Sequence, residues 1–213
     1  DAAERVTTVI EDALETMAAA GATIVDPVDV VDPDRLESAR VVSHEFARDF
    51  ARYLSEVGKT APYDSLAEVL ATGEVDPAVE SRIEAADALD IDVASLDSDV
   101  DYLARLRRRD ELRDETLSRL VDEDLDALLY PPSTVPPVDI PEHQPFGEMN
   151  CELAAHTGLP AVVVPAGFTD GGIPVGVELL GRAFGEQRLF ELAHAFERTA
   201  DGRRPPERFG PIE

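Results

Sequence analysis

The chain has 213 residues, 44% of them hydrophobic, so it is long enough to bury a core as one large domain or two small ones. Its 45 acidic residues outnumber 19 basic ones and give a net charge of -26, which disfavours nucleic acid and anionic membranes as partners because both would be repelled. Lys59 is the single lysine, and we interpret this composition as that of a halophilic protein from a high-salt cytoplasm, where salt screens the self-repulsion; an acidic protein from ordinary salt is the alternative.

The first predicted element is an amphipathic helix that stops at Gly21. Its apolar residues recur at helical spacing: Val6, Ile10, Ala13, Leu14 and Met17. The stretch "ATIVDPVDV" then predicts a short strand that runs into a loop. Asp32-Pro33 is typical of an N-cap and a first helical position, and the apolar residues from Leu36 to Val57 predict one helix that continues from it.

Further helical segments lead to a long charged helix, predicted from Ser98 to Leu120. "LDALLYP", residues 125 to 131, then predicts a buried strand that ends at a pair of prolines. We therefore expect a mainly helical insertion at about 33–121, flanked by strand-bearing parts that share one sheet. The expected fold class is α/β, with a mixed β-sheet covered by helices.

The stretch "GLPAVVVPAGFTDGGIPVGVELLGR", residues 158 to 182, follows a predicted helix from Gly147 to Thr157 with Gly158 as its stop. Two apolar runs predict strands, and Asp170-Gly171-Gly172 supplies the positive φ angles of a tight connection. A last helix is predicted from about Gly185 to Arg198. Its inward residues are expected to be Leu189, Leu192, Ala193 and Phe196.

Cys151 is the only cysteine, which excludes an internal disulfide and a multi-cysteine metal site. The four histidines show no metal-ligand spacing, so neither a metal nor another cofactor is expected. The chain has no long apolar run and no signal peptide at its start, and we expect a cytoplasmic protein without a membrane segment. Because it lacks an initiating methionine, we expect it to be a piece of a longer protein or a processed product.

The C-terminal motifs resemble those of the amidase signature family. The resemblance rests on Asn150, on the strand and loop "GLPA" and "PAGF" (158–161 and 165–168), and on "GIPVG" followed by Gly181-Arg182. "LDALLYPPSTVPP" is similar to another segment of that family. Residues 122 to 200 match closely and residues 1 to 31 loosely. The resemblance implies that residues 1–213 are the C-terminal portion of an amidase-signature domain.

The resemblance also implies catalytic residues that this sequence does not show. Enzymes of the family use a serine nucleophile, a bridging serine and a lysine base, the serines lying in a Gly/Ser-rich segment. The chain has no adjacent serine pair. Lys59 with Ser133 is a poor substitute, because "PPSTVPP" is rich in prolines, which lack the N–H groups of an oxyanion hole. We therefore expect the catalytic N-terminal half to precede Asp1, and this chain alone to be inactive.

Other candidate sites have simpler interpretations. Ser133 with His143 and His156 has no nucleophile elbow around it, so a loop serine and two surface or cap histidines are favoured. The basic cluster "RLRRRDELR", 105 to 113, alternates with acidic residues and predicts intrahelical ion pairs rather than an RNA site. Cys151 is either a reactive thiol or, as we favour, a small core residue inside an apolar helix.

The resemblance implies that C-terminal loops help to form the acyl-side pocket for a small-molecule amide. By position, the substrate-binding candidates are the proline loop near Ser133, together with Phe146, Asn150 and Cys151. Simple packing of these residues against the sheet is the alternative. Three functions stay open: part of a carboxamide hydrolase, part of a tRNA-dependent amidotransferase subunit that needs partner subunits, and a non-catalytic remnant or binding domain. A bare sheet edge without the N-terminal half predicts self-association.

Overall fold

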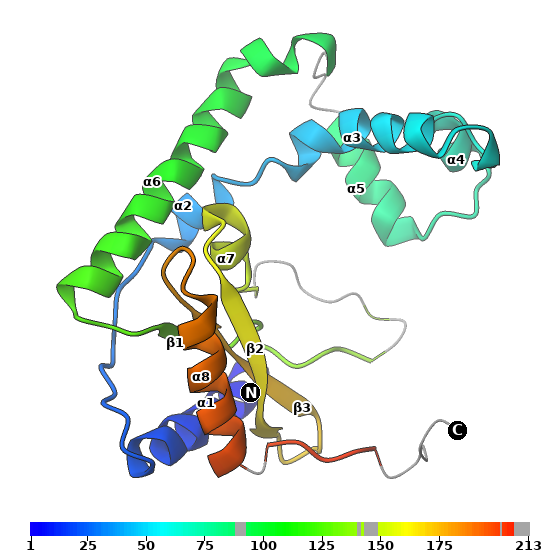
Figure 1. Ribbon diagram of the computed structural model, residues 1–213. Coiled ribbons are helices and arrows are strands. Elements are labelled where there is room, and N and C mark those ends of the chain that lie inside the picture. The colour runs from blue at the N-terminus through cyan, green and yellow to red at the C-terminus, as the bar shows by residue number, and fades with distance from the viewer. Residues whose placement is uncertain (88–92, 140–141, 143–148, 201, 207–213) are drawn as a thin grey trace. The chain divides into compact units, whose positions relative to one another are not determined.

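The computed structural model describes all residues except 88–92, 140–141, 143–148, 201 and 207–213 (Figure 1). The chain divides into two compact units. The first unit comprises Asp1–Val31 and Leu112–Glu213, and the second unit comprises Asp32–Glu111. The long helix α6, Val100–Asp122, contains the second boundary, so the part of α6 from Leu112 onward belongs to the first unit.

The sheet of the first unit consists of β1 (Leu128–Tyr130), β2 (Ala161–Phe168) and β3 (Pro174–Leu180) in the order β1-β3-β2. Both strand pairings are antiparallel. A tight turn joins β2 to β3, in which the N–H of Gly172 donates to the carbonyl of Thr169 at 2.7 Å. Gly172 has φ 75°, the left-handed conformation that glycine adopts without steric cost.

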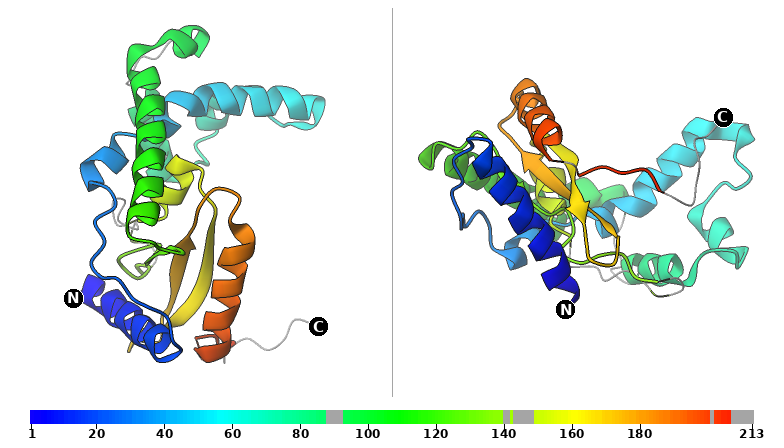
Figure 2. Two further views of the ribbon diagram at one scale, coloured as in Figure 1. Left: turned by 60° about the vertical axis from the view of Figure 1, so that its left-hand side comes forward. Right: turned by 90° about the horizontal axis from the view of Figure 1, so that it is seen from below.

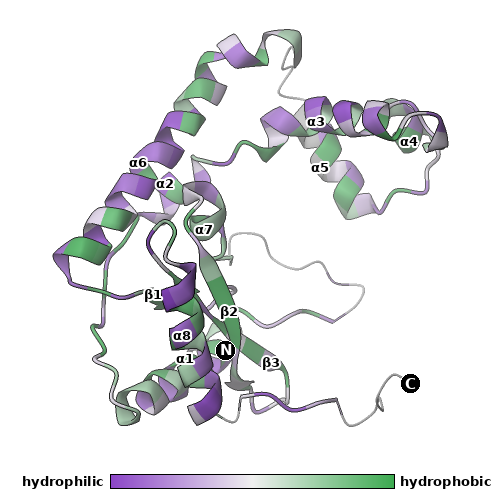
Figure 3. Ribbon diagram, viewed as in Figure 1, coloured by the Kyte–Doolittle hydropathy of each residue, from purple (hydrophilic) through white to green (hydrophobic). Residues whose placement is uncertain are grey.

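One face of this sheet packs against α1 (Ala2–Ala19) and α8 (Glu186–Thr199), as Figures 1 and 2 show. Alternate residues of a strand point to the same face, and Val175, Val177 and Leu179 bring the middle strand into this core. The helices and β2 contribute the other buried members: Val6, Val9, Ile10, Ala13, Val164, Leu189, Ala193 and Phe196. Burial of each Val, Leu or Ile side chain in this core stabilises the fold by about 2 kcal/mol. Figure 3 shows the hydrophobic colour along β2 and β3. The predicted α/β fold is confirmed.

The helix before β2 is shorter than predicted. Within the described residues, α7 spans Glu152–Thr157, and it ends at Gly158, whose φ of 63° is the left-handed cap that the sequence predicted. Cys151 is the N-cap residue of α7 and therefore lies at its start, not inside an apolar helix. The first two residues of the predicted helix, 147–148, lie outside the described residues.

The second unit is helical. It contains α2 (Pro33–Glu37), α3 (Val42–Val57), the 3-10 helix η1 (Gly58–Thr60), α4 (Leu66–Ala71), α5 (Pro77–Asp87), the 3-10 helix η2 (Val93–Ser98) and the first part of α6. A small core forms where Val41, Leu96 and Tyr102 are buried, with Leu106 packed against them. Asp32 caps α2 through the N–H of Asp34, as the Asp-Pro pair predicted.

Two sequence predictions were wrong. "ATIVDPVDV" forms no strand, and Ile24 and Val25 are 36% and 44% exposed; strand propensity is effective only with a partner strand to pack against. The single helix predicted from Pro33 to Val57 is two helices, because the chain breaks at residues 38–41. Among the described residues, no helix combines the length and apolar character needed to cross a membrane.

Candidate functional site

The structure brings together three of the four predicted site residues. Ser133 lies in the loop after β1, and Asn150 and Cys151 lie in the segment before α7. Ser133 and Met149 form an isolated antiparallel bridge, which joins the two segments. Phe146, the fourth candidate, lies outside the described residues. We call residues 131–135 the proline loop, and this loop together with Asn150 and Cys151 the site.

Asn150 ties the two segments of the site to each other. Its main-chain N–H donates to the carbonyl of Pro132 at 3.0 Å, and its side-chain Nδ2 donates to the carbonyl of Pro131 at 3.0 Å. The N–H of Cys151 donates to the same Pro132 carbonyl at 3.2 Å. Because the two prolines have no N–H group, their backbones can only accept hydrogen bonds, through these carbonyls. Asn150 is therefore a structural clamp on the proline loop.

Ser133 is not arranged as a nucleophile. Its hydroxyl donates to the carbonyl of Val135 at 2.8 Å, inside the same loop. An activated serine instead donates its proton to a general base, and a carbonyl cannot accept that proton. The observed hydrogen bond fixes the loop and leaves the Ser133 oxygen without activation.

A buried carboxylate that was not predicted as a site residue lies under the proline loop. Glu178 on β3 is only 3% exposed, and the hydroxyl of Tyr130, its registered neighbour on β1, donates to its Oε1 at 2.8 Å. Pro132 lies over Gly176, two residues earlier on the same face of β3: a Cβ on this glycine would lie 3.9 Å from Pro132 Cγ, an ordinary contact, and only 2.9 Å from Val163 Cγ1, so the missing Cβ makes room for Val163. The lone charge in the apolar run "PVGVELL" is the signal that could have found this residue.

Electrostatics keep the two titratable neighbours of Glu178 protonated. Burial, and then the charge of Glu178, raise the pKa of Tyr130 far above its ordinary value, so the phenol stays a hydrogen-bond donor. Burial also raises the pKa of Cys151, with added contributions from the charges of Glu178 and Glu152. A thiol is nucleophilic as a thiolate, so Cys151, half-buried and protonated, is not an activated nucleophile.

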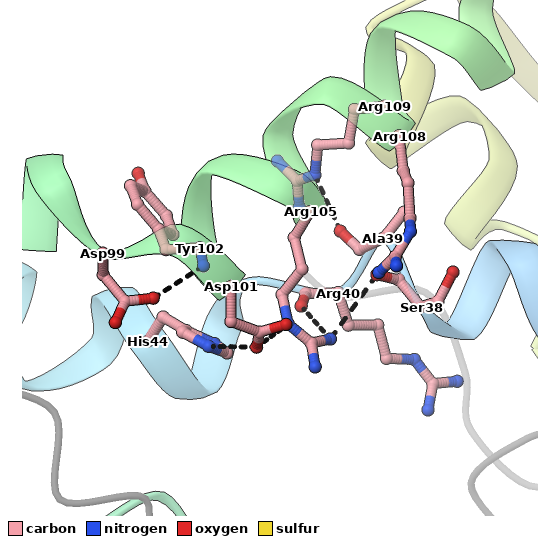
Figure 4. A network of polar contacts seen from close by, with 10 residues as sticks. All are labelled: Ser38, Ala39, Arg40, His44, Asp99, Asp101, Tyr102, Arg105, Arg108 and Arg109. Carbon is pink, nitrogen blue, oxygen red and sulfur yellow. Dashed lines mark hydrogen bonds and ion pairs between the residues drawn. The ribbon is translucent and has the colours of Figure 1, made fainter.

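A second polar cluster lies in the second unit (Figure 4). Arg108 donates to the carbonyl of Ser38 at 3.2 Å, and Arg109 donates to the carbonyl of Ala39 at 3.0 Å. Arg105 donates to the carbonyl of Arg40 at 3.1 Å. These carbonyls belong to the break between α2 and α3, where no following helical turn supplies N–H donors to them. The guanidinium groups donate the hydrogen bonds instead. The cluster is a brace for this break.

The basic cluster forms intrahelical ion pairs, as predicted, in addition to its contacts with the backbone carbonyls of residues 38–40. Arg107 pairs with Glu111 at 3.0 Å, and Arg105 donates to Asp101 at 2.8 Å, both at helical spacing. Asp101 also lies 3.2 Å from Nε2 of His44, a side chain that is 7% exposed. No group of three or more His, Cys, Asp or Glu side chains suited to a metal ion occurs in the part of the chain that the structure describes.

Comparison with known proteins gives the family. The family model described as Amidase matches residues 1–190. The chain belongs to the amidase family. Among solved structures, the native peptide amidase of Stenotrophomonas maltophilia aligns with 94% of this chain at 27% identity and a TM-score of 0.70, and an amidase family protein of Bacillus anthracis aligns with 94% at 25% identity and 0.73. The predicted amidase-signature resemblance is confirmed.

This chain spans only a part of each of those amidases. The aligned region covers 41% of the Stenotrophomonas maltophilia chain and 36% of the Bacillus anthracis chain. Among curated relatives, the A-type subunit of the glutamyl-tRNA(Gln) amidotransferase of Brevibacillus brevis is 40% identical over 90 residues, which are 38% of this chain and 18% of that protein.

The Gly-Arg motif of the amidase resemblance has a structural explanation here. Arg182 follows β3, and its guanidinium donates to the carbonyls of Leu120 and Leu125, at 3.2 Å each. These carbonyls lie at the end of α6 and before β1. Arg182 thus fixes the approach of the chain to β1, and through β1 it fixes the start of the proline loop.

Proposed function

We propose that this chain is the C-terminal portion of an amidase-family hydrolase that cleaves the C–N bond of a carboxamide. The observation that carries the proposal is the alignment of 94% of the chain with the peptide amidase of Stenotrophomonas maltophilia, at 27% identity. The family membership supports the reaction class. The contribution proposed for this chain is a scaffold and part of the substrate pocket.

The proline loop is the proposed pocket wall. Ser133, Asn150 and Cys151 are held together by main-chain and side-chain hydrogen bonds, which give the wall a fixed shape. Phe146 is kept as a proposed member on sequence position alone. A rigid wall of this kind orients an acyl group before reaction, and pre-orientation lowers the barrier of a chemical step.

The proposed catalytic set is a serine nucleophile, a bridging serine and a lysine base, none of which we assign in this chain. The absence of an adjacent serine pair from the sequence and the carbonyl-bound hydroxyl of Ser133 support this assignment. We therefore propose that an N-terminal half supplies catalysis. The sequence encoded before Asp1 tests the proposal: a lysine followed by a Gly/Ser-rich segment with two serines is expected. A complete product with these residues that releases no ammonia from any carboxamide would contradict it.

The second candidate function is that of a tRNA-dependent amidotransferase subunit. The similarity to the A-type subunit of the glutamyl-tRNA(Gln) amidotransferase of Brevibacillus brevis supports it. One assay distinguishes the two functions. A hydrolase releases ammonia from simple carboxamides without other subunits, whereas an amidotransferase component is expected to require its partner subunits and a charged tRNA. A non-catalytic remnant would do neither.

The proposed partner of this chain is the N-terminal half, and self-association is the expected substitute. Among the described strands, β2 lies at one end of the sheet, with β3 on its inner side. Val163 in this strand is 54% exposed. A strand edge presents N–H and C=O groups that pair with another strand when one is available.

A further inference from the structure

The unusual feature of the site is a carboxyl side chain, Glu178, that is buried beside the proline loop. The face of β3 that bears Gly176 and Glu178 lies opposite the core packed by α1 and α8. Glu178 occupies the centre of a cross-strand row, with Tyr130 on β1 and Val163 on β2 as registered partners. Tyr130 donates one hydrogen bond to Glu178, and among the described residues no cationic side chain forms an ion pair with this carboxylate.

The two charges that raise the pKa of Cys151 have the same sign. The ionised groups that act on the Cys151 thiol are Glu178 and Glu152, both negative. Glu152 lies 3.8 Å from Nε2 of His156 and is about one quarter exposed, so solvent screens it more than Glu178. Glu178, with 3% of its surface exposed, is the less screened of the two. Charges act more strongly when protein rather than water surrounds them.

We propose that Glu178 is a specificity-determining residue, whose carboxylate makes the site accept neutral or cationic groups and exclude carboxylates. Bringing an anionic group beside a buried carboxylate costs free energy, whereas an amino group or an uncharged hydrogen-bond donor is favoured. The charge preference itself does not depend on the proposed amidase function. Only the identification of the ligand as a carboxamide rests on it. In that function, the substrate class is carboxamides whose acyl part is neutral or bears an amino group.

The single cysteine makes the charge of the site measurable without any enzymatic activity. Cys151 is the only thiol in the chain and lies in the site. Its thiolate attacks the sulfenyl sulfur of a methanethiosulfonate, forms a mixed disulfide and expels methanesulfinate. Reagents with a trimethylammonium or a sulfonate group differ in charge and share this chemistry. The ratio of their rates cancels the thiolate fraction and reports the local potential.

The experiment compares the two rates on the whole chain in about 1 M KCl, where the Debye length of ~3 Å screens the general acidity of the surface. Rates are normalised to a neutral small thiol. We expect the cationic reagent to be favoured at Cys151 by about tenfold or more, and the isosteric Glu178→Gln to reduce this preference by about tenfold. Tyr130→Phe keeps the carboxylate and should keep the preference. Glu123→Gln, at an exposed pair with Arg119, is the matched control and should change nothing.

A normalised ratio near one for the unmodified chain would overturn the proposal, and this result does not depend on whether a variant folds. A folded Glu178→Gln with an unchanged ratio would also overturn it. The outcome is independent of the proposed hydrolase activity. A complete protein that fails to cleave carboxamides while Cys151 retains the charge preference would refute the proposed function and leave the charge selection intact.

Discussion

The hydrogen bond between Tyr130 and Glu178 makes the stability of the first unit depend on alkaline pH. Tyr130 donates to the buried carboxylate at 2.8 Å, and its pKa is raised because burial and the charge of Glu178 both oppose the phenolate. The folded chain therefore keeps the phenol proton to a higher pH than the unfolded chain. This stabilisation is fully present below the unfolded pKa, about 10, and is lost as pH rises above it.

The expected magnitude follows from proton linkage. Each proton that the folded state retains and the unfolded state releases lowers the free energy of unfolding by ~1.4 kcal/mol per pH unit. Between about pH 10 and pH 11, Tyr130 alone should remove ~1 kcal/mol, because half of the unfolded phenol is still protonated at pH 10. Tyr130→Phe should lose this part of the slope. At neutral pH the same variant should cost about 2 kcal/mol, because a buried carboxylate loses its hydrogen-bond donor.

The assay is urea unfolding followed by far-UV circular dichroism at a series of alkaline pH values, in molar KCl. Tyr53→Phe is the matched control, since Tyr53 is 59% exposed, and it should keep the slope of the unmodified chain. Cys151→Ser separates the contribution of the neighbouring thiol, whose pKa is also raised by burial. Identical alkaline slopes for Tyr130→Phe and the unmodified chain would refute the reasoning.

Three other predictions concern the brace, the surface charge and the sheet edge. Arg105→Lys should destabilise the second unit by about 1–2 kcal/mol in urea unfolding, because one ammonium group cannot bind both Asp101 and the Arg40 carbonyl. The control Arg107→Lys, at an exposed ion pair, should change the free energy of unfolding by less than about 0.5 kcal/mol. Equal effects of the two variants would contradict the brace. The thermal midpoint should be higher in molar KCl than in about 0.1 M KCl, and an unchanged midpoint would contradict the halophilic interpretation. Light scattering across a dilution series should show self-association, whereas a strictly monomeric chain without affinity for an N-terminal half would show that the β2 edge is closed.

Local sequence patterns predicted the elements that are stabilised by interactions between neighbouring residues or by the packing of one apolar face. The α1 and α8 faces, the Asp32 cap and the Gly158 stop all follow from spacing and backbone preference. The break at residues 38–41 did not follow, because arginines some 70 residues away in the sequence stabilise it. The missing strand at "ATIVDPVDV" is a similar case, since a strand depends on a neighbour that propensity does not reveal.

The site shows the same limit. Motif position placed Ser133, Asn150 and Cys151 in one region, and the structure brings these three residues together. Their role in binding a substrate stays a prediction. Glu178 was missed because a charge within a strand is usually read as a solvent-facing residue, whereas cross-strand register and the loop above it bury this one.

Ammonia release from a carboxamide is the most direct test of the central claim that this chain supplies scaffold and pocket but no catalytic groups. The purified chain is assayed alone and after mixing with the proposed N-terminal half, in molar KCl. No release above background is expected from the chain alone, and release is expected from the mixture. Turnover by the chain alone that disappears in Ser133→Ala would contradict the claim, because the nucleophile would then lie in the proline loop.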